Sequence, residues 1–371
     1  MLSKSSLFLL QKHAENEIIK RCLNISFSRI LKERNKLAIT IKDVAKLAGV
    51  STATVSMVVN QKADRITEKT KNDVLDAIEK LDYKPNYTAR SLVSSQSFTI
   101  GLIVPEITNP FFAEFSRNLE SHLHQAGYIT FLCNSEEDLS LEARYIDELI
   151  ARSIDGLIIC GLTEESKAKL PLLKKHLIPY LILDNRRTQN NFSIGINDFE
   201  GGRLVAKHFL SLGHNICAFV GDFSGYRNLY RRYEGFSDVL LKAKKEVISF
   251  KTELTKKGGQ QVAKKIFDSK ATAVFCGSDL IAVGIYEQAR IYEMCLPDDL
   301  SIAGFDDISF AEILSPKLTT VKQPLEKMAE IAVANLLKMI QDKNFSFDTK
   351  TLPVKLLIRN STSHPNTINL I

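Results

Sequence analysis

The stretch that decides the fold of the first part of the chain runs from Thr40 to Asn60 and reads TIKDVAKLAGVSTATVSMVVN. Thr40 is followed three residues later by Asp43, a capping-box pattern in which the hydroxyl and the carboxylate each satisfy a backbone N–H of the first helical turn. Apolar residues then recur at helical spacing until Gly49, which ends the pattern. The sequence therefore predicts a first helix whose buried face carries Ile41, Val44, Ala45 and Ala48.

A second and a third helix follow at once. Ser51 is a good N-cap for a helix with Val55, Val58 and Val59 on its inner face. Two short helices joined by a tight turn that contains glycine are typical of a helix-turn-helix, whose second helix enters the major groove of DNA. An ordinary core would produce the same amphipathic pair, so this spacing alone does not establish DNA binding. A third helix is expected from about Thr67, with a buried face of Val74, Leu75, Ile78 and Leu81.

The whole string, together with the later run PN..ARSL at 85–92, resembles the DNA-binding domain of the LacI/GalR family of bacterial transcription regulators. The resemblance extends from about Ala38 to Asn360. It implies a double-stranded DNA operator as partner, and a short hinge helix whose leucine, here Leu92, wedges into the minor groove and kinks the DNA. The residues that it assigns to DNA binding are Ser51, Thr52, Ala53, Ser56, Met57, Asn60, Asn86, Ala89 and Leu92.

Met57 departs from this pattern. Relatives commonly carry Arg or His at its position, and both can donate hydrogen bonds to guanine in the major groove. Methionine has no such donor. Either its thioether packs on a thymine methyl group or it is a neutral filler, and both interpretations predict a half-site without a strong guanine requirement.

Length and charge set the domain organisation. A chain of 371 residues allows two or three domains, and 44% hydrophobic residues is typical of a soluble globular protein. The net charge of +6 is uneven: residues 1–39 carry about +5, residues 40–96 about +2 and the remainder about −1, so charge by itself is weak support for nucleic-acid binding. The expected boundaries are an N-terminal extension at 1–38, the helix-turn-helix domain at 39–84, the hinge at 85–96 and a two-lobed effector-binding and dimerisation core at 97–371.

The N-terminal extension and the cysteines bear on location. Residues 1–38 lie outside the family pattern, and they are either a basic amphipathic helix that touches phosphate or a disordered or misassigned start. No apolar run approaches 18 residues, so no membrane span is expected, and the opening apolar segment is too short for a signal peptide. The six cysteines form no C-x-x-C pair, which favours reduced thiols in the cytoplasm.

From Phe98 onward apolar runs alternate with helical patterns. Runs that are apolar throughout and separated by helices indicate parallel sheets covered on both faces. About 260 residues exceed one doubly wound unit, so two lobes are expected, with a cleft between the carboxyl ends of their strands. The predicted strands read TIGLIV, YITFLCN, DGLIIC, PYLILD, FSIGIN, ICAFVG, VISF, TAVFCG and LSIAGF, with helices around 111–127, 139–151, 201–212, 233–243 and 279–292.

The family resemblance implies the same architecture, a periplasmic-binding-protein-like core with three connections between its lobes. The matching motifs are NPFF at 109–112, NDFEGGRLVAKHFLSLGH at 197–214, RYEGF at 232–236, GFDDISFAEILSPKLTTVKQP at 304–324 and LPVKLLIRNS at 352–361. One lobe is expected to take residues 97–196 and the helix after Pro324. The other is expected to take residues 197–320 and the last strand.

The resemblance also implies an effector site. Its chemistry suits a sugar, because an aromatic face stacks on the ring while charged and amide groups bond its hydroxyls. The phenylalanines also suit a helix start packed into the core, and the aspartates, which end strands, suit loop or capping roles. The implied residues are Asn109, Phe111, Phe112, Asp184, Arg232, Ser278, Asp306 and Gln323.

Three departures concern the effector. Ser278 stands where sugar-binding relatives often have Asn, and Asn185 follows Asp184 where Arg is common. Glu253 falls in a region where purine-responsive relatives have an aromatic residue. These departures argue against a purine and leave the sugar unnamed.

The chain is therefore expected to be a homodimeric DNA-binding repressor that is controlled by a sugar or sugar derivative and needs no cofactor. Control by a protein co-effector is an open alternative. A sugar-binding transport protein is another, although it would need a signal peptide and would not carry 40–92. No nucleotide-binding, metalloprotease or hydrolase motif is present and the seven histidines do not cluster at metal spacing, so no enzyme activity is expected.

Overall fold

The computed structural model describes residues 39–59, 66–84, 96–161, 164–183, 193–222, 227–345 and 349–366. The chain divides between residues 95 and 96 into two compact units. Five predicted site residues, Asn60, Asn86, Ala89, Leu92 and Asp184, lie outside the described residues, as do the predicted N-terminal extension and almost all of the predicted hinge.

The first unit contains α2 (Ile41–Ala48), α3 (Thr52–Val59) and α4 (Glu68–Lys80). The predicted cap of α2 is confirmed, because the Thr40 N–H donates to the Asp43 carboxylate at 2.8 Å. Gly49 ends α2 with φ +67°, a left-handed conformation that glycine adopts without a steric penalty. The Ser51 hydroxyl accepts from the Thr54 N–H at 3.1 Å at the start of α3. Helix α2 thus begins and ends where the sequence predicts, and α3 begins where the sequence predicts.

The core of this unit is a small apolar cluster in which Val44, Val55 and Val74 are fully buried, one from each helix. The prediction for Leu75 is wrong, because its side chain is 46% exposed. Ala77 is buried in its place, since 74, 77, 78 and 81 form one helical face and residue 75 is rotated about 100° away from it.

The second unit contains two six-stranded sheets with the same strand order, apart from the strand added at the far edge of each. The first has the order β11-β5-β4-β3-β1-β2 and the second β12-β10-β9-β8-β6-β7. All pairings are parallel except that of β12 with β10, which the predicted parallel sheets did not include. The strands are β1 (Thr99–Val104), β2 (Ile129–Asn134), β3 (Gly156–Cys160), β4 (Tyr180–Leu183), β5 (Ser193–Ile196), β6 (Ile216–Val220), β7 (Glu246–Phe250), β8 (Ala273–Cys276), β9 (Ser301–Asp306), β10 (Thr319–Lys322), β11 (Lys350–Leu352) and β12 (Lys355–Leu357).

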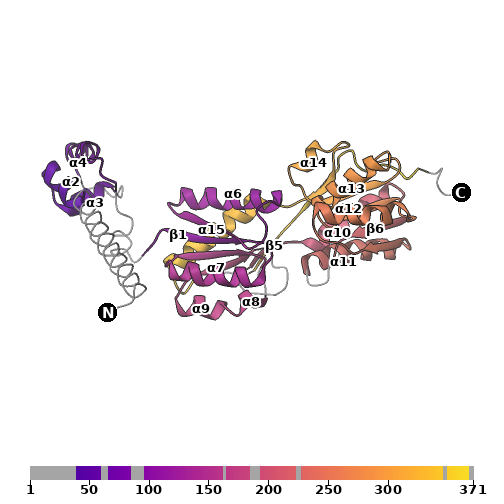
Figure 1. Ribbon diagram of the computed structural model, residues 1–371, viewed down its shortest axis with the longest axis horizontal. Helices are drawn as coiled ribbons and strands as arrows, with labels where there is room; N and C mark the ends of the chain where they lie inside the picture. The colour runs from indigo at the N-terminus through magenta and orange to yellow at the C-terminus, as the bar shows by residue number, and fades with distance from the viewer. Residues whose placement is uncertain are drawn as a thin grey trace, which may run out of the picture. The chain divides into compact units, whose positions relative to one another are not determined.

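In the first lobe, α6 (Pro110–Gln125) and α15 (Leu325–Gln341) cover one face of the sheet, while α7 (Leu139–Ala151) and α9 (Leu170–Lys175) cover the other, as Figure 1 shows. A short helix, α8 (Glu164–Lys167), precedes α9. Alternate residues of β1 point to the two faces: Leu102 joins the α6 side and Ile103 joins the α7 side. The helix after Pro324 therefore belongs to the first lobe, as predicted.

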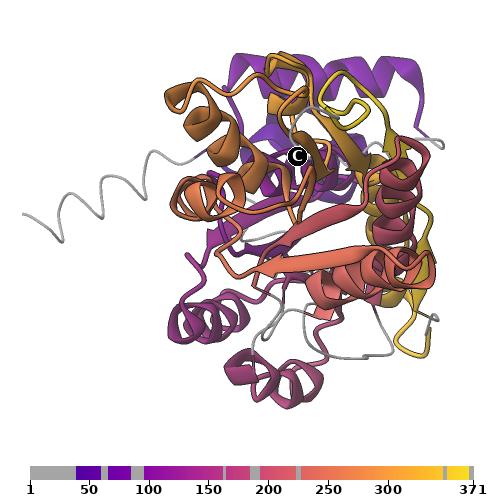
Figure 2. The same cartoon turned by 90° about the vertical axis from the view of Figure 1, so that its right-hand side faces the viewer.

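In the second lobe, α10 (Asp198–Ser211) and α11 (Arg227–Lys242) lie on one face of the sheet. The other face is covered by α12 (Lys256–Phe267), α13 (Asp279–Ile291) and the short α14 (Phe310–Ile313) (Figure 2). The first face is rich in aromatic residues, with Phe219, Phe275 and Phe305 of the strands buried against Phe209 and Phe236 of the helices.

Three short crossings connect the two lobes. The chain passes over after β5, after β10 and between β11 and β12. At the first crossing, the Asn197 N–H donates to the Leu352 carbonyl of the third crossing at 2.9 Å. The first and third crossings are therefore hydrogen-bonded to each other.

The edge strand β2 differs from the expectation that both sheet faces are covered. Ile129, Phe131 and Leu132 are exposed by 61%, 41% and 46%. Among the described cysteines, Cys160, Cys217 and Cys276 are fully buried free thiols, as their apolar strands predict. No helix within the described ranges is long and apolar enough to cross a membrane.

Candidate functional site

A cavity of the second unit lies between its two lobes and has a volume of about 660 Å³. Seven of the eight predicted effector residues line it: Asn109, Phe111, Phe112, Arg232, Ser278, Asp306 and Gln323. The cavity lies at the carboxyl ends of both sheets, where open α/β sheets bind ligands.

Arg232 of α11 is the fixed centre of this site. Its side chain is 5% exposed, and its Nε donates to Asp198 Oδ1 at 2.8 Å while its Nη1 donates to the Gly277 carbonyl at 2.7 Å. The guanidinium also lies over the Phe305 ring, 3.6 Å from the ring centre. A planar cation held by an anion, a carbonyl and an aromatic face has little rotational freedom.

Asp306 and Gln323 form the next part of the wall. Asp306 ends β9 with φ +115°, a conformation that costs a residue other than glycine roughly 1–3 kcal/mol. Gln323 Nε2 donates to Asp306 Oδ1 at 2.7 Å. Such strain persists only where the surroundings fix the backbone, and it is concentrated at ligand sites.

Ser278, before α13, has a buried hydroxyl with no hydrogen-bond partner. Behind it, fully buried Asp279 accepts from the Thr320 hydroxyl at 2.6 Å and from the Ile308 N–H at 2.9 Å. Burial, reinforced by the charge of Asp306, raises the pKa of the Asp279 carboxyl well above its usual value.

Asn109 and the two phenylalanines come from the start of α6. The Asn109 side-chain oxygen accepts from the Phe111 N–H at 3.0 Å, so this residue also caps the helix. Phe111 and Phe112 are 5% and 3% exposed, belong to the core and meet edge to face at 5.0 Å between ring centres. Both phenylalanine rings therefore pack in the core and also line the cavity.

Further lining residues are not among the eight predicted effector residues, although one rule would have found many of them, including Glu253, which the sequence tied to the effector only as a departure from relatives. Glu106 follows β1, Glu136 and Glu137 follow β2, Asp222 follows β6 and Glu253 follows β7, all at carboxyl ends of strands. The others are Thr108, Asn228, Thr252, Leu254, Thr255, Lys256, Lys257 and Leu280.

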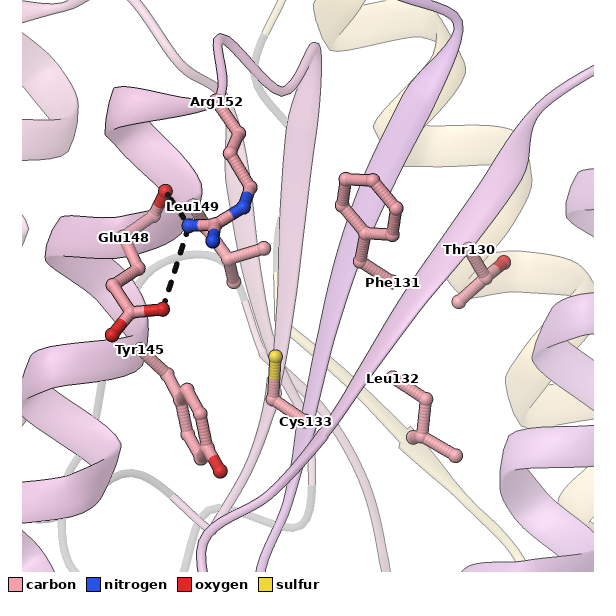
Figure 3. A pocket seen from close by; sticks show the side chains of 8 residues that line it. All are labelled: Thr130, Phe131, Leu132, Cys133, Tyr145, Glu148, Leu149 and Arg152. Carbon is pink, nitrogen blue, oxygen red and sulfur yellow. Dashed lines mark hydrogen bonds and ion pairs between the residues drawn. The ribbon is translucent and has the colours of Figure 1, made fainter. Parts of the chain in front are cut away.

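A second, smaller pocket of about 290 Å³ lies between β2 and α7 (Figure 3). Its lining includes Phe131, Cys133 and Tyr145. At one side of the pocket Arg152 forms an ion pair with Glu148, with 3.4 Å between Nη1 and Oε2. No residue of the predicted effector site lies here.

The predicted DNA-reading surface lies on α3 of the first unit. Its exposed residues are Thr52, Ala53 and Met57, and Ser56 is half-buried. The Ser51 hydroxyl is engaged in capping α3. Across the described ranges, no group of three or more His, Cys, Asp or Glu could hold a metal ion.

A helix-turn-helix unit and a two-lobed, cleft-containing α/β unit on one chain define a ligand-responsive DNA-binding protein. Residues 40–86 match the family model of bacterial regulatory proteins of the lacI family, and residues 206–362 match a periplasmic binding protein-like domain. The ribose operon repressor of Halalkalibacterium halodurans is 33% identical over 327 residues, which cover 87% of this chain and 97% of that protein. The transcriptional repressor PurR of Photobacterium profundum is 34% identical over 340 residues, 88% and 99% of the two chains.

Two solved structures are similar as well. A LacI family regulator from Enterococcus faecium with bound ribose covers 72% of this chain and 99% of its own at 35% identity, with a TM-score of 0.67. The Lac repressor dimer bound to operator and an anti-inducer covers 88% and 99% at 26% identity, with a TM-score of 0.77. The chain belongs to the LacI family of bacterial transcriptional regulators.

Proposed function

We propose that this chain is a repressor whose operator affinity is set by a neutral monosaccharide bound between the two lobes of its second unit. One observation carries the proposal: buried Arg232 and Gln323 and partly buried Asp306 form a polar cluster that shares a cavity with the unpartnered Ser278 hydroxyl. Sugar hydroxyls both donate and accept, so they can satisfy each of these groups. The proposal assigns no catalytic step to the site.

The wall favours a sugar over a purine. Phe111 and Phe112 are its aromatic residues, both come from α6, and among the described lining residues the second lobe contributes no aromatic ring. A flat base would therefore lack a ring on its opposite face. PurR relatives are as similar in sequence as the ribose repressor, so the cavity wall is the better discriminator.

The wall also favours a neutral ligand over a phosphorylated one. Six carboxylates among the described lining residues (Glu106, Glu136, Glu137, Asp222, Glu253, Asp306) outnumber three cations (Arg232, Lys256, Lys257). Like charges within a cleft repel an added phosphate. Ribose, which is bound in a relative with 35% identity, is the first candidate.

The DNA side of the proposal rests on α3, with Thr52, Ala53, Ser56 and Met57 as base-facing residues and Asn60, Asn86, Ala89 and Leu92 as further contacts. The domain boundaries 39–84, 85–96 and 97–371 belong to the same proposal. Effector binding needs to change operator affinity by only about 1–3 kcal/mol for control to be effective. A regulator of this kind works on the chromosome, which places it in the cytoplasm.

The proposed assembly is a homodimer, because one helix-turn-helix reads a half-site and a similar structure is a dimer on its operator. We assign the open edge of the first sheet to this contact. Ile129, Phe131 and Leu132 expose apolar side chains there, and an uncovered edge strand invites pairing. A second copy of the chain would bury both the apolar residues and the strand edge.

The test is a thermal-shift and operator-binding screen of the full chain with D-ribose, other neutral sugars, ribose 5-phosphate and hypoxanthine. A true effector at 100 times its Kd should stabilise the protein by about 2.7 kcal/mol and change operator affinity. A response to hypoxanthine or ribose 5-phosphate alone would reject a neutral sugar as effector. No response from any compound, with operator binding intact, would support a protein co-effector instead.

A further inference from the structure

The wall of the proposed effector site includes residues next to the crossings between the two lobes. Asp198 is the first residue of α10 after the crossing from β5, and Gln323 is the last residue before the crossing to α15. Between them lie Arg232 and Asp306, so that contacts run from Asp198 to Arg232 to Asp306 to Gln323. The groups that would meet a sugar therefore connect two of the three crossings.

Arg232 lies at different distances from its two carboxylate neighbours in this series of contacts. Arg232 lies 2.8 Å from Asp198 but 3.9 Å from Asp306, which is an ion-pair distance and not a hydrogen bond. Asp198 and the Gly277 carbonyl thus hold the guanidinium just short of Asp306. Without that restraint, a cation and a carboxylate this close in a buried wall would pair directly.

Direct backbone contact keeps Asp198 in place relative to Arg232. A Cβ on Gly202 would lie 2.0 Å from the Arg232 carbonyl oxygen, and one on Gly235 would lie 1.9 Å from the Phe199 carbonyl oxygen. Helices α10 and α11 therefore touch through two glycines beside the two residues of the ion pair. Their separation cannot drift without a cavity opening between the helices.

We propose that Asp198 is a positioning residue for the effector site: it holds Arg232 away from Asp306 so that both charges stay available to the ligand. Asp198 does not line the cavity and acts through Arg232. The inference rests on the proposed function for its ligand, because a sugar is what would bridge Arg232 and Asp306. The proposal also implies that a ligand in the cleft acts on the first crossing, because Asp198 lies there and bonds Arg232 in the cavity wall.

The experiment is a graded series at residue 198 in the full chain. Asp198→Ala removes the anion and the acceptor, Asp198→Asn keeps an acceptor without the charge, and Asp198→Glu keeps the charge. D-ribose affinity measured by calorimetry should fall at least tenfold for the Ala variant, less for Asn, and should be largely retained for Glu. Asp238→Ala is the matched control, because Asp238 pairs with Lys242 on the same helix as Arg232 and lies outside the cavity wall. Its ribose affinity should equal that of the wild type.

A second readout does not depend on the sugar. In a crystal structure of ligand-free Asp198→Ala, which lacks the acceptor, the Arg232 guanidinium should move to within about 3 Å of the Asp306 carboxylate, a direct hydrogen bond. The inference is overturned if that distance stays at its wild-type value, or if the Ala variant binds ribose as tightly as the Asp238 control. If wild-type protein binds no sugar, the proposed effector class fails, and the crystallographic distance alone decides the role of Asp198.

Discussion

A single hydroxyl in the cavity wall should affect stability and binding in opposite directions. The Ser278 Oγ is buried without a partner, so Ser278→Ala should leave the free energy of unfolding unchanged or slightly higher. Affinity for the sugar should fall by about 0.5–1.5 kcal/mol, because the ligand would satisfy that hydroxyl. Calorimetry and urea denaturation measure the two effects separately.

Ser116 provides the matched control for Ser278. Its hydroxyl is also buried and unpartnered, but it lies on α6 outside the cavity wall. Ser116→Ala should leave sugar affinity unchanged. Equal affinities of the Ser278→Ala variant and the wild type would remove Ser278 from the site.

Met57 is the residue whose replacement should change DNA sequence preference. Its side chain is 40% exposed on α3, the helix assigned to the major groove. Met57→Arg should add a guanine preference worth about 1–3 kcal/mol in each half-site, because Arg can donate two hydrogen bonds to guanine. Selection of binding sites from a random DNA pool measures it. If wild type and variant select the same guanine with equal stringency, Met57 does not face that base.

At the scale of elements, the contact between α10 and α11 should be intolerant of a single methyl group. Gly202→Ala should destabilise the protein by about 1–3 kcal/mol or more, since the new Cβ would meet backbone that cannot move aside cheaply. Gly195→Ala is the control, because no atom lies within 4 Å of its added Cβ. Urea denaturation of both variants gives the comparison, and equal stabilities would mean that the helices separate at little cost.

The C-terminal segment provides a pH-dependent element. The His214 ring bonds the Thr272 hydroxyl at 2.8 Å and the Ser363 carbonyl at 3.0 Å, and burial lowers its pKa to about 4. The unfolded chain binds a proton near pH 6.5 and the folded chain near pH 4, so stability is lost as pH falls through this window. The loss should reach roughly 3 kcal/mol by pH 4.

Replacing the ring tests this linkage. The His214→Gln variant should be less stable at pH 7 and should lack the steep fall between pH 6.5 and 4. His176→Gln, at an exposed position after α9, should retain the wild-type slope. An unchanged slope in His214→Gln would assign the acid sensitivity to other groups.

Sequence patterns predict elements well where one periodicity dominates. All nine predicted strands and the helix-turn-helix are present, because their apolar repeats and caps are strong. Helix α12 was not predicted, since its first turn contains Gly258 and Gly259, which are typical of a loop. In the structure, Gly258 packs against the backbone of Glu253 and Gly259 packs against the backbone of α13. Leu75 was placed inside because it is apolar, but a helix turns by 100° per residue whatever its composition.

The site was less accessible to sequence reasoning than the fold. Family resemblance named seven residues that line the cavity, but periodicity cannot show that residues 109 and 323 line the same cavity between the two lobes. Asp198 illustrates the remaining gap. It reads as a helix-capping acid in sequence, and only the distance to Arg232 reveals its charge partner.

At the scale of the whole molecule, the exposed edge of the first sheet should determine assembly. Phe131→Asp places a charge on the open β2 edge, so it should convert the proposed dimer into a monomer while leaving D-ribose binding intact, because the cavity lies elsewhere. Operator affinity should fall strongly, since two half-sites can then no longer be held together. Sedimentation and gel-shift titration measure both effects. Leu241→Asp, which alters an even more exposed apolar residue on α11, should remain dimeric. A Phe131→Asp protein that sediments as a dimer and binds operator at wild-type affinity would place the subunit contact on another face.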